Sequence, residues 1–341
     1  GLQASSLPSS VRDRLSGEML FARAFIYFQL ASLYGGVPLI LTTNFAQNES
    51  APRTEAAQVW MQIIKDLETA AELLPAIYPT SNRLRANKQS AIALLGRLYL
   101  YQQQWEKAIT ATTAVITDNR YALEILNNAF LATSKEAILQ ISMPPTSTSV
   151  TWEATIFLPS SATARPTFSL TDTLVKSFDN GDQRFSAWTL RRAVSGTTYT
   201  YPNKYKSRTA TAGAAKPEYI VVLRLAEQYL IRAEAWAMQG NLVNAINDLD
   251  VIRVRAGLPK IADTSPSISK DDLLKVIAHE RQIELFAEWG HRWLDLRRTG
   301  SIDTRLSGIK MGWQSYKALY PIPFTQIRDN PALTQNPGYS N

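Results

Sequence analysis

Apolar residues recur at helical spacing in two separate regions of the chain. They stand three or four positions apart, at Ala91, Leu94, Leu95 and Leu98 in the first region and at Ala226, Tyr229, Leu230 and Ala233 in the second. This spacing places them on one face of an α-helix. Each region is therefore predicted to form a helix with one buried side.

Each of these helices leads, after a polar break, into a second apolar segment. Gly96 and Ala108 lie twelve positions apart, and so do Ala233 and Ala245. A small residue at both points allows two antiparallel helices to approach closely, as in a tetratricopeptide hairpin. The chain is thus predicted to be mainly α, with hairpins that must stack because one hairpin cannot bury its own apolar face.

A third helix pair is predicted nearer the start of the chain. One helix covers residues 17–34 and ends at Gly35 and Gly36, and the other covers residues 54–74 with Thr54 as its N-cap. The apolar stripe of the second helix, which should face its partner, is formed by Val59, Ile63, Leu67, Ala70 and Leu74. These residues extend the helical scaffold towards the N-terminus.

A further helix is predicted to begin near Ser269. Asp272 follows three residues later, where a carboxylate can complete a shortened capping box. We expect this helix to run on through residues 279–298.

Between residues 118 and 219 the helical periodicity fails. The segment is rich in Thr, Ser, Pro and Gly, with a short strand predicted at residues 137–141 and a turn at Asn180 and Gly181. It also holds many aromatic residues, which a linker would lack. An irregular region of this length on a helical scaffold is typical of a binding surface.

These patterns predict four segments within one compact unit. Residues 1–117 form N-terminal helical hairpins, residues 118–221 an irregular ligand-binding region with short strands, residues 222–300 a C-terminal hairpin with a further helix, and residues 301–341 an extended segment. With 45% hydrophobic residues in 341, the chain can bury a large core.

Composition excludes several function classes. The net charge of +7 is spread along the chain without a basic block, which argues against nucleic acid as a partner. The absence of cysteine excludes a disulfide framework, a thiolate metal site and a cysteine nucleophile. The most apolar stretch, residues 90–101, is too short to span a bilayer, which takes about 20 apolar residues.

Catalytic patterns are scarce. His279 and His291 stand twelve apart, so they do not form a zinc-binding His-Glu-x-x-His motif, and neither a nucleophile elbow nor a phosphate-binding loop occurs. Asp179 and Asp182 are conceivable as the paired carboxylates of a glycosidase. The Asn-Gly pair between them favours a solvated turn instead. We therefore expect no catalytic residue, no cofactor and no metal site.

Residues 279–298 carry the most specific pattern in the chain. Glutamates and arginines recur there at three- and four-residue spacing, which predicts a structural ion-pair network along one side of a helix: Glu280, Arg281, Glu284, Glu288 and Arg292. The run resembles the signature of the SusD/RagB family, nutrient-binding lipoproteins on the outer surface of certain Gram-negative bacteria. Trp289 lengthens the usual Glu-Gly-x-Arg-Trp spacing of that signature by one residue.

Further blocks resemble the same family in the same order along the chain. They comprise residues 23–39, residues 223–235 with 252–258, and residues 319–323 with 330–339. Family members carry an export signal and a lipidated cysteine ahead of the first block. The opening, which starts with Gly1 and lacks both features, is therefore interpreted as a truncated or processed end.

The resemblance implies a non-catalytic protein of the outer membrane, facing the cell surface and held there by a lipid anchor. Such a protein captures oligosaccharide or polysaccharide and delivers it to a TonB-dependent, SusC-like transporter. A tetratricopeptide scaffold, or a family member that binds peptides, is the alternative. An enzyme of the helical glycosidase kind ranks third.

Glycan binding calls for particular side chains. Pyranose rings present flat apolar faces bordered by hydroxyl groups, so exposed aromatic rings serve as platforms and polar side chains as a rim. The platform candidates in the irregular region are Trp152, Trp188, Tyr199 and Tyr201, and the rim candidates are Arg184, Arg191 and Asn203. Each aromatic has an alternative place in the core, where large rings are usually buried.

Overall fold

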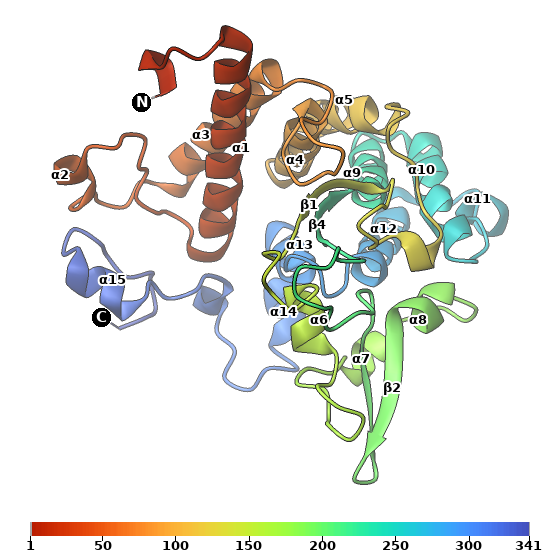
Figure 1. Cartoon of the computed structure of the whole chain (residues 1–341). Coiled ribbons are helices and arrows are strands. Elements are labelled where there is room, and N and C mark those ends of the chain that lie inside the picture. The colour runs from red at the N-terminus through yellow and green to blue at the C-terminus, as the bar shows by residue number, and fades with distance from the viewer. Residues whose placement is uncertain (1, 341) are drawn as a thin grey trace. The chain divides into compact units, whose positions relative to one another are not determined.

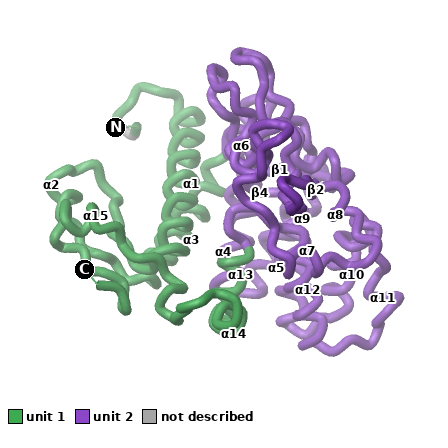
Figure 2. Tube along the Cα trace, turned by 90° about the horizontal axis from the view of Figure 1, so that it is seen from below, with its two compact units in different colours: residues 1–74, 292–341 green, residues 75–291 purple. Residues whose placement is uncertain are grey.

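The computed structural model describes residues 2–340, and it confirms a mainly helical chain with few short strands (Figure 1). The chain divides into two compact units, which Figure 2 colours separately. The first unit combines residues 1–74 with 292–341, and the second comprises residues 75–291. The changes of pattern predicted at residues 117, 221 and 300 therefore do not coincide with the edges of these units.

The first unit is built on two long helices, α1 (Ser9–Tyr34) and α3 (Ala56–Leu73), which pack against each other. The stripe predicted for α3 is buried, and Gly35, at a φ of 74°, ends α1 as expected. The helix boundaries differ from the prediction, because α1 begins earlier than residue 17 and α3 starts after Glu55, not Thr54. Gly17 allows the close approach, since a Cβ there would lie 2.8 Å from Cγ of Leu74.

The rest of the first unit consists of short helices joined by loops. They are η1 (Leu2–Ala4), α2 (Phe45–Asn48), α13 (His291–Arg298), α14 (Ile302–Leu306), η3 (Ser315–Ala318) and α15 (Phe324–Asp329). A small cluster of Leu296, Ile302 and Leu306 packs α13 against α14.

The second unit contains both predicted hairpins. The first pairs α4 (Lys88–Tyr101) with α5 (Trp105–Ile116), and the second pairs α9 (Leu225–Met238) with α10 (Leu242–Arg255). The hairpins stack through α5 and α9. At the predicted close approach, a Cβ on Gly96 would lie 2.9 Å from Cγ2 of Thr112, so no larger residue fits without movement.

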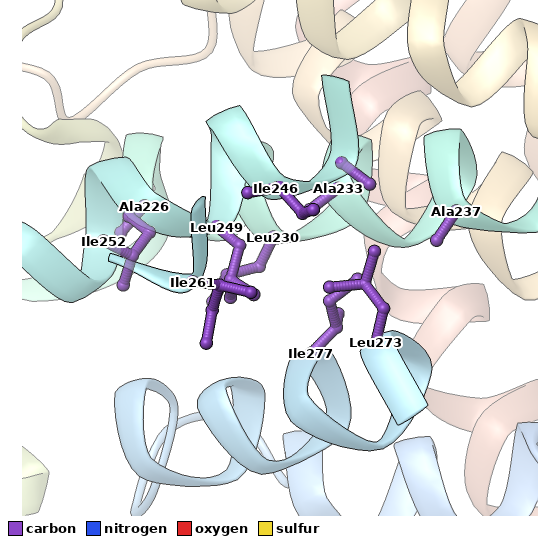
Figure 3. Close-up of a cluster of buried hydrophobic side chains, with 11 residues drawn as sticks. Ala226, Leu230, Ala233, Ala237, Ile246, Leu249, Ile252, Ile261, Leu273 and Ile277 are labelled. Carbon is purple, nitrogen blue, oxygen red and sulfur yellow. The ribbon is translucent and has the colours of Figure 1, made fainter. Parts of the chain in front are cut away.

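The second hairpin joins α12 (Lys270–Glu284) around an aliphatic cluster (Figure 3). The short helix α11 (Ile261–Thr264) contributes one residue to it. The cluster is formed by Ala226, Leu230, Ala233, Ala237, Ala245, Ile246, Leu249, Ile252, Ile261, Leu273 and Ile277. We call this set the aliphatic cluster.

The irregular region folds into short helices and two small antiparallel sheets. Its elements are η2 (Leu126–Asn128), β1 (Ala137–Ile141), α6 (Trp152–Phe157), α7 (Asp172–Val175), α8 (Gln183–Trp188), β2 (Thr189–Val194), β3 (Thr197–Pro202) and β4 (Ile220–Arg224). The predicted strand is β1, which pairs with β4, and β2 pairs with β3 as a hairpin. This hairpin turns at Ser195 and Gly196, both at positive φ.

A second core cluster holds the irregular region together. Its buried members come from η2, β1, β4, α6, α8, nearby loops and the segment after α12: Leu126, Ala129, Phe130, Ala137, Ala154, Trp188, Tyr205, Val221 and Phe286. The rings of Trp188 and Tyr205 meet that of Phe130 edge to face, with centroids 5.7 and 5.2 Å apart. We call this set the aromatic cluster.

The helix predicted through residues 279–298 is interrupted. It begins as expected, because the side chain of Ser269 accepts a hydrogen bond from the backbone of Asp272, but α12 ends at Glu284 and α13 starts at His291. Ala287 and Trp289 lie between, both at positive φ, which no α-helix accommodates. The indole of Trp289, the additional residue of the signature, donates a 2.7 Å hydrogen bond to the carbonyl of Val221.

Within residues 2–340, each helix is too short or too polar to cross a membrane.

Candidate functional site

The glutamates of the signature meet basic side chains from other elements inside the second unit. Glu284 accepts hydrogen bonds from Arg184 at 3.0 Å, from Arg224 at 2.6 Å and from Arg255. Glu288 binds Arg224 and Lys204. An ion-pair network was predicted and is confirmed, but its partners come from across the fold, not from one side of one helix.

The network holds its members charged although they are buried. Burial acts to raise the pKa of Glu284, but Arg255, Arg224 and Arg184 outweigh it and hold the pKa well below its usual range. Burial lowers the pKa of Lys204 to about 8, against the opposite pull of Glu288. Buried, fully paired charges of this kind serve the fold, so we do not place a ligand site there.

This network also removes one predicted rim residue from the surface. Arg184 is buried and forms ion pairs with Asp182, Glu280 and Glu284, so its assignment to a ligand rim is wrong. The prediction of Asn203 as a rim residue is also wrong. Asn203 is buried beside the aromatic cluster, where its backbone N–H donates to the carbonyl of Trp188 at 2.7 Å.

Two predicted platform residues belong to the core as well. The indole of Trp188 is fully buried in the aromatic cluster, and its Nε1–H donates to the carbonyl of Leu126 at 2.9 Å. Tyr201 is 3% exposed on β3. Trp188 is buried because Leu126 and Phe130, which are distant in sequence, cover its ring and remove its apolar area from water.

Trp152 is different, because its side chain is 58% exposed at the start of α6. Ile156 follows four residues later and is 40% exposed, so both lie on the same outward face of the helix. Ala154 anchors the opposite side of α6 in the aromatic cluster. We call the pair Trp152 and Ile156 the α6 face.

Hydrogen bonds fix α6 at both ends. The side chain of Thr151 caps its start by accepting from the backbone of Ala154, and Arg208 donates to the carbonyls of Thr155 and Leu158 at its end. The exposed indole therefore stands on an anchored element. A rigid aromatic loses little conformational freedom when a ligand stacks on it.

Glu153 follows Trp152 on α6, but its carboxyl interacts with the buried side chains of Glu288 and Tyr205. Its carboxyl is half-buried, and its Oε2 atom has no hydrogen-bond partner among the described residues. Burial raises the pKa of Glu153, and the negative charge of Glu288 raises it further. A carboxyl shifted in this direction gains a proton more readily and can then donate as well as accept hydrogen bonds.

The remaining candidates lie on the hairpin of β2 and β3. Tyr199 is half-buried and pairs in register with Arg192, whereas Arg191 is exposed and places its guanidinium 5.1 Å from the ring centre of Phe185. Arg192 donates to the carbonyls of Ser161 and Ala164, so a loop after α6 is tied to the hairpin. Tyr199 and Arg191 thus stay predictions, on a different element from Trp152.

The paired carboxylates considered for glycosidic cleavage are engaged elsewhere. Asp182 is buried and bound to Arg184, and Asp179 lies 3.4 Å from Arg253 and 3.6 Å from His279. Gly181, at a φ of 85°, confirms a turn between them. Within residues 2–340, three or more His, Asp or Glu side chains do not gather in any arrangement suited to a metal ion.

Comparison with known proteins explains why the signature and the fold occur together. The profile described as SusD family matches residues 117–339, and a second, described as starch-binding associating with outer membrane, matches residues 2–100. The chain belongs to the SusD family. The pattern of residues 279–298 was therefore a correct guide to the family.

Individual SusD-family relatives match different lengths of the chain. SusD-like protein P38 of Formosa agariphila is 25% identical over 95% of this chain and 73% of its own length. The starch-binding protein SusD of Bacteroides thetaiotaomicron is 33% identical over a shorter stretch, 35% of this chain and 21% of its own. A solved laminarin-binding SusD-like protein shares 27% identity and a TM-score of 0.81 over 99% of this chain and 81% of its own.

Sequence reasoning missed one residue of the α6 face. It singled out Trp152 but not Ile156, although the four-residue spacing from Trp152 was available as a signal. Because residues 118–221 were interpreted as irregular, the sequence analysis did not predict a helical face there. Phe168, also exposed, carried no comparable signal.

Proposed function

We propose that this SusD-family protein binds a glycan at the bacterial cell surface, without cleaving it, and delivers it to a TonB-dependent, SusC-like transporter of the outer membrane. The family, the starch-binding description and the laminarin-binding relative support a glycan as the ligand. The description of the profile over residues 2–100 supports the outer membrane as the location.

The observation that carries the proposal is the exposure of Trp152 on an anchored helix. An indole left in water forgoes the free energy of burial, about 25 cal/mol per Å² of apolar area. Ile156 extends the same apolar surface. A sugar ring, with its apolar face, is complementary to this surface.

The carboxylates support binding without cleavage. Hydrolysis by acid and base needs two carboxyl groups about 5 to 10 Å apart with access to the substrate. Asp182, Glu280, Glu284 and Glu288 are buried in ion pairs, and burial in this form denies them that access. The α6 face therefore acts as a binding platform.

Calorimetry with starch- and laminarin-derived oligosaccharides tests the proposal. Stacking on an indole contributes about 0.5 to 1.5 kcal/mol beyond area burial, so Trp152→Ala should weaken binding several-fold to about tenfold without changing the melting temperature. Tyr199→Ala and Arg191→Ala test the hairpin candidates in the same way. Phe324→Ala is the matched control, because Phe324 is exposed in the first unit and should leave affinity unchanged.

Two results would count against the proposal. Equal affinity of the parent and the Trp152, Tyr199 and Arg191 variants would remove these residues as the site. Binding of extended peptides but of no glycan would favour a peptide-binding member of the family. Delivery is tested separately by recovering a TonB-dependent transporter with the tagged protein from outer-membrane extracts.

A further inference from the structure

The second unit also contains a pocket of about 590 Å³ that shares no residue with the α6 face. It lies between the extended segment that leads into η2, the helix α8 and the end of α10. Its lining comprises Leu123, Glu124, Ile125, Leu126, Asn127, Gln183, Ser186, Ala187 and Arg255. This volume is within the range of about 300 to 1,000 Å³ that is usual for small-ligand sites.

Hydrogen bonds to residues behind the lining hold the pocket walls in place. The indole of Trp188 binds the carbonyl of Leu126, and the backbone N–H of Gln183 donates to the carbonyl of Ala256 at 2.9 Å. These bonds connect η2, α8 and α10. A ligand would therefore enter a pocket that is already formed, which lowers the ordering cost of binding.

The charged residues of the lining have partners. The guanidinium of Arg255 donates to Glu136 at 2.8 Å and to Glu284, and Oε1 of Glu124 accepts from the backbone of Lys135 at 3.0 Å. The charge of Arg255 is therefore matched, whereas Glu124 keeps its negative charge, because a backbone N–H does not neutralise a carboxylate. The pocket thus disfavours an anion and suits a neutral ligand whose hydroxyl groups can donate to Glu124.

Uncharged polar groups of the lining remain available. The side-chain amide of Gln183 has no hydrogen-bond partner among residues 2–340, and Asn127 uses only its Oδ1 atom, which accepts from Lys206. Ser186 donates to a carbonyl of its own helix and keeps its acceptor capacity. Amide and hydroxyl groups of this kind pair with sugar hydroxyls.

An apolar wall faces the same space. Ile125 is 67% exposed, and Leu123 precedes it by two positions in the extended segment. The backbone N–H groups of these two residues have no acceptor among the described residues, whereas those of Ala122 and Glu124 bind Lys135 and Glu136. The segment thus offers apolar side chains and unpaired donors together.

We propose that this pocket is a second glycan subsite, which takes a neutral sugar residue against Leu123 and Ile125 with Gln183, Asn127 and Ser186 as hydrogen-bonding partners. The inference rests on the proposed function, since it assumes the same class of ligand. In this proposal the α6 face and the pocket lie on separate surfaces around the aromatic cluster. Ala154 of α6 and Leu126 of the pocket both belong to that cluster.

Hydrogen exchange with saturating starch- or laminarin-derived oligosaccharide tests the subsite. Ligand in the pocket should slow exchange several-fold at Leu123 and Ile125, whose amides are unpaired in the free protein. Ser186→Trp, which fills the space with an exposed side chain, should abolish that protection while leaving protection at residues 152–157 intact. Trp152→Ala should have the converse effect.

Gln183→Leu provides a second variant, which removes the amide at nearly constant volume and should reduce the protection at Leu123 and Ile125. Gln102→Leu is its matched control, since Gln102 is exposed in the same unit and outside the pocket.

The outcomes separate the subsite from the proposed function. Protection confined to residues 152–157 overturns the subsite and leaves the proposed function standing. Unchanged protection of the pocket amides in both Ser186→Trp and Gln183→Leu also overturns the subsite. If no oligosaccharide binds anywhere, both proposals fail, and protection of these amides by an extended peptide alone would assign the pocket to peptides.

Discussion

The aliphatic cluster and the ion-pair network occupy the same unit but use opposite means of stabilisation. The aliphatic cluster consists of Ala, Leu and Ile at helical spacing, and it gains free energy from every apolar group removed from water. The network surrounds Glu284 with the guanidinium groups of Arg184, Arg224 and Arg255, whose desolvation offsets much of their attraction.

The difference lies in what each region tolerates. An aliphatic core accepts another apolar residue of similar volume, because the interaction is non-directional. A buried ionic network requires every partner at once, since one missing carboxylate leaves several guanidinium groups without a counter-charge. The network thereby specifies how β4, α8, α10 and α12 meet. Two of these elements, β4 and α8, also contribute residues to the aromatic cluster, against which α6 and the pocket segment pack.

The largest loss of stability is expected for Glu284→Gln, in the ion-pair network. This change keeps the volume but removes the charge that three arginines share, so we expect a loss of about 3 to 5 kcal/mol in the free energy of unfolding, measured by urea denaturation. As a control, Lys275→Ala removes a solvent-exposed pair with Asp272 and should leave stability unchanged. A loss at Glu284 no larger than at Lys275 would contradict a cooperative network.

The aliphatic side is probed by Leu249→Ala and Leu249→Ile. Leu249 is fully buried, so the alanine variant should lose about 2 to 5 kcal/mol through lost burial and the cavity left behind. The isoleucine variant should lose less than about 1.5 kcal/mol, because the volume is conserved. Equal losses in the two variants would show that shape, not apolar volume, governs this cluster.

Low pH should weaken the buried ion pairs but not the aliphatic cluster. Burial acts to raise the pKa of Glu227, but the adjacent Arg97 outweighs it and holds the pKa at about 2. Because this lies below the unfolded value near 4.5, the stabilisation is complete above pH 4.5 and is lost as the pH falls towards 2. The contribution at stake is on the order of 3 kcal/mol.

The measurement is the free energy of unfolding between pH 3 and 6 for the parent, Glu227→Gln and Leu249→Ala. The parent should fall more steeply with acid than Glu227→Gln, by up to about 1.4 kcal/mol per pH unit, and Leu249→Ala should keep the parental slope. Parallel curves for the parent and Glu227→Gln would refute the assignment.

The smallest expected effect concerns the close approach of α4 and α5. Gly96→Leu should destabilise the protein by about 1 to 3 kcal/mol, since even a Cβ would meet Thr112 at 2.9 Å. Gly308→Leu is the control, because a Cβ there meets no atom within 4 Å. The melting midpoints of the parent and both variants are compared. An unchanged midpoint in Gly96→Leu would contradict the close contact of α4 and α5.

Local patterns predicted the scaffold well. The hairpins were predicted from Gly96 and Ala108, and from Ala233 and Ala245. This was possible because helical spacing and small contact residues can be recognised within a short stretch of sequence. Ser269 was found as an N-cap for the same reason. The break between Glu284 and His291 was not predicted. Gly290 offered a local signal for it, whereas the positive φ of Ala287 and Trp289 had none, because these residue types are ordinary in helices.

The candidate site was predictable only in part. Trp152 and Trp188 both stand in the irregular region, and their neighbouring residues do not distinguish a platform from a core ring. Their difference arises because Leu126, Phe130 and Tyr205 cover Trp188 and leave Trp152 in water.

The sequence by itself determined the helical hairpins, because these follow from spacing along a helix and between adjoining ones, and its motifs resembled the family that the comparisons show. Tertiary structure alone decided which aromatic rings are exposed, which arginines neutralise Glu284 and where a pocket opens. The physical reason is that burial and charge pairing depend on segments far apart in sequence, such as Arg184 and Glu284, which are 100 residues apart.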